Sequence, residues 1–197
     1  MSVFLTTYQR NRIASLLLAI ILGGCAGSSN RVVSHTLDNR WKFVQGDDIN
    51  YAKPLFDDAS WIVISSKTAF EFQGFPLVDG YVWYRKRFTM HEDLERAVWK
   101  TGGMRIHLGT IDDVDQLYVN GMLVNGSGSF PPNYVSAFHA ERTYVIPAAC
   151  LVRGRENVLA VRVYDGNNIG GIVADSIVIR NLSHEEMAIF SSGQKQK

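Results

Sequence analysis

The 197-residue chain lacks several features that would fix its class at once. It has only two cysteines, Cys25 and Cys150, so we expect no framework of disulfides to stabilise the fold. Cys150 lies in the apolar segment Ile146 to Leu151, where we expect a buried and unreactive thiol. The formal net charge of +1 provides no basic surface of the kind that nucleic-acid-binding proteins use. We therefore expect a single globular domain that relies on its hydrophobic core and binds no nucleic acid.

No apolar run in the N-terminal region is long enough for a convincing membrane span, which takes roughly 20 residues. The apolar segment 13–22 follows Arg10 and Arg12 and leads into Gly23, Gly24 and a cysteine. A basic segment, an apolar segment and small residues in this order are typical of a signal peptide. We therefore expect residues 1–24 to be removed from the mature protein.

The sequence Leu22-Gly23-Gly24-Cys25 resembles the bacterial lipoprotein signal, in which the cysteine becomes the acylated first residue. The resemblance implies that Cys25 is lipidated and that residues 25–34 form a flexible tether. Ala26 is similar to the residue that follows the cysteine in outer-membrane lipoproteins. We therefore expect a lipid-anchored protein of the bacterial cell envelope, at the outer membrane and facing the periplasm. The alternative is an ordinary secretory signal with a soluble periplasmic or extracellular product.

The remaining sequence has no sustained helical period and no internal repeat, and it consists of short strands separated by turn signals. We expect strands at 41–44, 61–64, 81–88, 104–108, 115–119, 122–124, 142–146, 158–164 and 176–179. Asn120-Gly121 supplies the positive backbone angles of a tight type I′ hairpin. This pattern predicts an all-β fold, a jelly-roll β-sandwich over residues 35–182, rather than βαβ units.

Helical structure is expected in only two places. Residues 91–99 are compatible with a helical turn between strands. Ser183 to Glu186 has the form of a capping box, which predicts a short helix at the start of the C-terminal segment 183–197. We expect residues 191–197 to form a frayed tail.

Several short motifs follow one another along the chain. They are Trp41-Lys42-Phe43, 56–61 (FDDASW), Gln73-Gly74, Asp79-Gly80, 82–88 (VWYRKRF), 108–113 (LGTIDD), 118–121 (YVNG) and 157–165 (NVLAVRVYD). Over residues 35–180 this order resembles the sugar-binding jelly-roll domain of glycoside hydrolase family 2, a galactose-binding-domain-like sandwich. The resemblance implies this fold and a carbohydrate or glycan ligand. Similar modules accompany sialate O-acetylesterases and bacterial sensor proteins.

We assign no catalytic residue. Hydrolases of the family carry two catalytic glutamates on a separate barrel, and a barrel takes about 250 residues, whereas this chain has 197. It also has no Gly-Asp-Ser segment like that of the acetylesterases, and no nucleophile motif surrounds Cys150. We therefore expect a non-catalytic binding module. A small glycan-modifying hydrolase is the least favoured alternative.

Candidate ligand-binding residues come from three regions. Trp83 and Arg85 share one strand face, and Arg162 and Tyr164 lie opposite the core face of another strand. A glycine-rich loop carries further aromatic and polar residues, and the family resemblance adds the loop before the strand 81–88. The full set is Gln73, Asp79, Trp83, Arg85, Phe130, Asn133, Tyr134, Arg162 and Tyr164.

Structural roles are the alternative for the same residues. Arg162 would then pair with Asp113 or Asp115, and Phe130 and Tyr134 would cover the edge of the sandwich in an Ω-type loop. A second contact loop of the family corresponds to 165–170, which lacks the long insert of some members. An envelope lipoprotein with a structural or protein-interaction role, and no sugar binding, therefore stays open.

Asp112, Asp113 and Asp115 form an acidic group of the kind that suits Ca²⁺. Their spacing does not match a defined calcium loop, so we assign no metal ligand and no cofactor, and structural calcium remains an alternative. Adjacent aspartates in a strand point to opposite faces, which makes them a poor acid and base pair. We expect them to shape the turn, or to pair with Arg85 or Arg162.

Overall fold

A computed structural model describes residues 31–76, 79–166 and 169–194 of the chain. Cys25, the signal peptide and the tether up to residue 30 lie outside the described residues. The first described segment is already attached to the domain, because Val33 N donates to Asn181 Oδ1 at 2.7 Å. No helix in the described part of the chain has the length and hydropathy of a membrane span.

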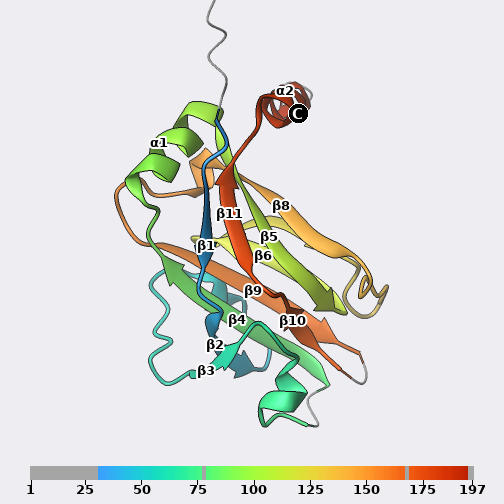
Figure 1. Cartoon of the computed structure of the whole chain (residues 1–197). Helices are drawn as coiled ribbons and strands as arrows, with labels where there is room; N and C mark the ends of the chain where they lie inside the picture. Colours follow the sequence, from blue (N-terminus) through green and yellow to red (C-terminus); the bar gives the residue numbers. More distant parts are fainter. Residues whose placement is uncertain (1–30, 77–78, 167–168, 195–197) are drawn as a thin grey trace, which may run out of the picture.

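Two antiparallel sheets make up most of the described part of the chain (Figure 1). The first contains β1 (Ser34–Leu37), β11 (Ile177–Asn181), β5 (Gly103–Asp112), β10 (Gly171–Val173) and β8 (Glu141–Pro147). In the second, the order is β3 (Ile62–Ser65), β2 (Arg40–Gln45), β4 (Gly80–Phe88), β9 (Asn157–Asp165), β6 (Val114–Val119) and β7 (Met122–Ser127). This architecture confirms the predicted all-β sandwich.

The core lies between the sheets and follows from the alternation of side chains along each strand. Trp41 and Phe43 of β2, Val82 and Tyr84 of β4, and Val161 of β9 point into it and are fully buried or nearly so. Outside the second sheet, a smaller apolar cluster contains Ala52, Trp61, Trp83, Tyr118 and Ala160, with Tyr51 and Phe56 packed against it. The chain between β2 and β3, which includes the 3₁₀ turn η1 (Ile49–Ala52), therefore covers part of that face.

The helices differ from the prediction in length. Residues 92–101 form a full helix, α1 (Glu92–Thr101), and α2 (His184–Gln194) includes residues 191–194, which were wrongly predicted to be frayed. The capping box is confirmed, because Glu186 N donates to Ser183 Oγ and Ser183 N donates to a Glu186 carboxylate oxygen. Both helices lie at one end of the sandwich, at the top of Figure 1.

Glycines with positive φ occur at two places that shape the sheets, a hairpin turn and a β-bulge. The hairpin between β6 and β7 has Asn120 at φ 50° and Gly121 at φ 85°, as a type I′ turn needs. In β5, the register with β8 shifts between His107 and Gly109, and Gly109 has φ 73°. β5 pairs with β8 on both sides of this bulge, and it pairs with β10 near its C-terminal end. The remaining 3₁₀ turns are η2 (Phe70–Gln73) and η3 (Ala148–Cys150).

Candidate functional site

Aromatic side chains gather on the outer face of the second sheet, where β4 and β9 pair. Tyr81 and Tyr164 are cross-strand partners, and their ring centroids lie 4.9 Å apart. The loop between β7 and β8 adds Phe130, which stacks on Tyr81 at 5.7 Å, and Tyr134, whose ring lies 5.5 Å from that of Tyr164. We call these four residues, together with Arg162, the aromatic–arginine cluster.

Arg162 joins the rings of the cluster. Its Cζ lies 4.4 Å from the centroid of the Phe130 ring and 4.6 Å from that of Tyr81. Its Nε donates to Asp47 Oδ1 at 2.7 Å, Nη2 donates to the other Asp47 oxygen, and Nη1 reaches Gln116 Oε1 at 3.3 Å. Burial lowers the pKa of Arg162, but the hydrogen bonds and charge of Asp47 outweigh it and raise the pKa overall. The predicted pairing of Arg162 with Asp113 or Asp115 is therefore wrong.

The loop that supplies Phe130 and Tyr134 is held in place by hydrogen bonds within the loop and to the buried Arg142. Ser129 and Val135 exchange two backbone hydrogen bonds of 2.9 Å. Arg142, fully buried, donates from Nε to Asp115 Oδ1 at 2.7 Å and from Nη1 to the Ala137 carbonyl at 2.6 Å. Because Asp115 is committed to Arg142, it is not free to pair with Arg162. The loop thus presents its aromatic residues from a fixed base.

A groove of about 340 Å³ adjoins the cluster along the edge strand β7. It is lined by Asp115, Gln116, Leu123, Val124, Asn125, Gly126, Gly128 and Phe130. Phe130 belongs to both the groove and the cluster, and Gln116 contacts Arg162. The Tyr134 side chain stays 40% exposed beside them. This combination offers ring faces for stacking and polar groups for hydrogen bonds.

Asp112 and Asp113 lie at the corner where the chain passes from β5 in one sheet to β6 in the other. Burial, a hydrogen bond with Asp113 and the negative charges of Asp113 and Asp165 raise the pKa of Asp112 to about 7. Burial also tends to raise the pKa of Asp113, but hydrogen bonds from Asp112, Ser136 and other donors lower it overall. The two carboxyl groups therefore contact each other, contrary to the prediction of opposite faces, because Asp113 lies between the strands.

This carboxyl pair has neither glycosidase nor calcium geometry. Catalytic carboxyls flank a glycosidic bond at separations of about 5 Å or more, whereas Asp112 and Asp113 share a hydrogen bond. The third acidic residue, Asp115, is fully engaged by Arg142 and by Tyr144, whose hydroxyl donates at 2.8 Å. We therefore interpret these aspartates as structural residues. They connect the turn between β5 and β6 to the loop between β7 and β8 and to Gly166, whose N donates to Asp113 at 3.0 Å.

Other predicted ligand residues do not join the cluster. Trp83 and Arg85 are fully buried beneath the chain between β2 and β3, where Arg85 Nε donates to Asp58 Oδ2 at 2.8 Å, so their placement on an open surface was wrong. Gln73 uses its amide to hold the turn after β3, with Oε1 accepting from Ser65 N at 2.6 Å. Asp79 and Asn133 are exposed.

Tyr81 of the cluster and Asp47, which pairs with Arg162, were not predicted. Tyr81 has a signal in the sequence, because it lies two positions before Trp83 on the same strand face. Asp47 has none, since it lies 115 residues from Arg162. Cys150 is partly rather than fully buried, and burial raises the pKa of its thiol.

No protein-family model and no curated protein matches the chain. The structure of the chain, however, is similar to several solved structures. A β-glucuronidase from Bacteroides uniformis is similar at 19% identity and a TM-score of 0.58, over 76% of this chain and 18% of the enzyme. A glycosyl hydrolase family 2 member from Bacteroides cellulosilyticus is similar at 21% identity and a TM-score of 0.54, over 75% and 20%. Ruminococcus gnavus β-glucuronidase has 13% identity and a TM-score of 0.56, over 78% and 30%.

The chain thus spans less than a third of the length of each of these enzymes. At such identities the likeness concerns the fold alone. The described domain has the β-sandwich fold that also occurs as one part of glycoside hydrolase family 2 enzymes.

Proposed function

We propose that this chain is a non-catalytic carbohydrate-binding module of a lipid-anchored envelope protein. The observation that carries the proposal is the aromatic–arginine cluster, which opens beside the β7 groove on the outer face of a sandwich shared with sugar-processing enzymes. The lipid anchor rests on the sequence around Cys25 alone.

The cluster suits an uncharged sugar better than a highly charged one. Arg162 is neutralised by Asp47, so it adds hydrogen-bonding edges rather than net positive charge. Tyr134 is exposed enough for its ring to stack on the apolar face of a pyranose. Gln116 and the Asp47 carboxylate, which both accept hydrogen bonds from Arg162, are the neighbouring polar groups that would exchange hydrogen bonds with hydroxyl groups of the sugar.

Binding can be tested by calorimetry on the delipidated protein with peptidoglycan fragments, lipopolysaccharide sugars and plant oligosaccharides. We expect at least one of these sugars to bind, and we expect Tyr134→Ala to weaken its binding about tenfold or more. An anchor aromatic contributes about 1.4 kcal/mol or more to binding, which corresponds to this factor. Phe72→Ala is the matched control, because Phe72 is 72% exposed and belongs to η2, outside the cluster. Uniform absence of binding by the folded protein, or equal losses in both variants, would count against the proposal.

A second candidate function is contact with an envelope protein. The same loop leaves Val135 59% exposed and Phe138 45% exposed, which is a more apolar surface than a sugar requires. Under this function, the double variant Phe130→Ala/Tyr134→Ala loses a stoichiometric partner that the unmodified protein retains in a pull-down from solubilised envelopes. Unchanged partner capture would reject this role for the loop.

A further inference from the structure

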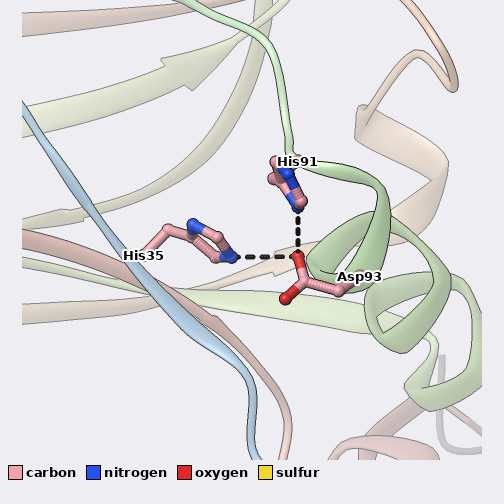
Figure 2. Close-up of side chains that lie close together, drawn as sticks. All are labelled: His35, His91 and Asp93. Atoms are coloured by element: carbon pink, nitrogen blue, oxygen red, sulfur yellow. Dashed lines mark hydrogen bonds and ion pairs between the residues drawn. The ribbon is translucent and has the colours of Figure 1, made fainter.

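Two histidines and an aspartate converge at the end of the sandwich where α1 begins (Figure 2). His35 comes from β1, His91 is the N-cap residue of α1, and Asp93 lies in its first turn. His35 Nε2 lies 3.0 Å from Asp93 Oδ1, and His91 Nδ1 lies 2.8 Å from the same oxygen. Figure 2 shows both rings directed at this one oxygen from two different elements.

The ligand types and distances match those of a transition-metal site. The three ligand atoms lie within 4.8 Å of one another. Zinc binds imidazole nitrogen and carboxylate oxygen at about 2.0–2.2 Å, which places tetrahedral ligands roughly 3.3 Å apart. Small rotations of these side chains would reach that arrangement. They have room to move, since the side chains of His35, His91 and Asp93 are 35%, 72% and 46% exposed.

The surroundings leave an open coordination position. In the first turn of α1, Glu92 pairs with Arg96 and Glu95 with Arg153, so Asp93 is the carboxylate of that turn that faces the two imidazoles. A cavity of about 370 Å³, lined by residues 31–35 and Asp93, provides space for a water or another ligand on the metal.

We propose that His35, His91 and Asp93 bind a divalent transition-metal ion of the zinc type, with water completing the coordination. Imidazole selects such ions over Ca²⁺ and Mg²⁺, which prefer sets of oxygen ligands. The ion would link β1 to α1 and so fasten the N-terminal strand to the body of the domain. This site is separate from the aromatic–arginine cluster and does not depend on sugar binding.

The test is titration of the full-length chain, without a polyhistidine tag, with Zn²⁺ and, separately, Ca²⁺. We expect one equivalent of Zn²⁺ to bind, and His35→Gln and His91→Gln each to weaken binding by about tenfold or more. Hydrogen exchange of the β1 amides should slow when Zn²⁺ is added to the unmodified protein and not when it is added to His91→Gln.

His107→Gln is the matched control, because His107 is a partly exposed histidine of β5 that contacts Thr143 at 3.1 Å, outside the site. Thermal unfolding without metal checks that each variant folds, which His91 should permit given its exposure. Three results would overturn the proposal: no stoichiometric Zn²⁺ binding, binding that survives both substitutions, or a loss that His107→Gln produces equally.

Discussion

At the scale of single residues, the corner aspartates have opposite pKa shifts. The raised pKa of Asp112 means that its contribution to stability is fully present below the unfolded value of 3.8 and is lost as the pH rises through about 7. The lowered pKa of Asp113 means that its contribution is present above the unfolded value and is lost as the pH falls. Neighbouring residues of one type therefore respond to pH with opposite sign.

We predict that Asp112→Asn raises the free energy of unfolding at pH 8 by about 1 kcal/mol, a value kept small because solvent screens this partly exposed group. The gain should vanish as the pH falls toward 4, because the wild-type carboxyl is then protonated. Asp113→Asn should instead destabilise throughout pH 4 to 8, with a loss that shrinks only below about pH 4, because the pKa of Asp113 is lowered from 3.8. Urea unfolding between about pH 2 and 8 measures both. A gain for Asp112→Asn that is equal at both ends would contradict this account.

Only part of the candidate site could be predicted from residues in sequence. Strand alternation places Arg162 and Tyr164 outside the core, and it is a local property that the sequence carries directly. The partner of Arg162 is Asp47, from a distant loop, and nothing local distinguishes Asp47 from its neighbour Asp48. Trp83 was misplaced for a related reason, because alternation identifies the outer face of a sheet but not which part of it another segment covers.

At the scale of elements, the bulge in β5 should depend on a residue without a side chain. A Cβ on Gly109 would lie 2.5 Å from the Val173 carbonyl oxygen and 2.6 Å from the Ala174 Cβ. Both neighbours are held by the chain around β10, so they cannot move aside cheaply. The bulge and the β10 connection are therefore packed as one unit.

We predict that Gly109→Ala lowers the free energy of unfolding by about 3 kcal/mol or more, because backbone strain and a close contact add. Gly154→Ala is the matched control, since Gly154 has a similar φ of 65° but nothing within 4 Å of the added Cβ. It should lose only about 1 kcal/mol. Similar losses in the two variants, measured by chemical denaturation, would show that the contact with the β10 segment contributes little.

The elements that were predicted have strong local patterns, and those that were missed do not. Residues 81–88 and 158–164 alternate over many positions, and Asn120-Gly121 defines its turn chemically. β10 has only three residues and owes its conformation to pairing with β5. The helix α1 was underestimated because its apolar positions are few, and Leu94 and Val98 become decisive only when packed against the sandwich.

At the scale of the whole molecule, the proposed lipid anchor makes a direct prediction. Cys25→Ser should move the protein from the detergent phase to the aqueous phase in a phase-partition experiment, because the substituted residue cannot be acylated. The domain should keep its thermal unfolding midpoint, since residue 25 precedes the first described contact of Val33. An unchanged aqueous distribution of both proteins would instead favour the ordinary secretory signal.

The contact between His35 and Asp93 also has a consequence for where the described domain begins. It fixes the start of the domain beside α1, which follows the C-terminal end of β4. The nine residues of β4 extend about 30 Å, at 3.3 Å per residue, and the aromatic–arginine cluster lies at the opposite end of this strand, beside Tyr81. Under the proposed lipid anchor at Cys25, the length of the sandwich would therefore separate the proposed binding surface from the end of the domain to which the tether leads.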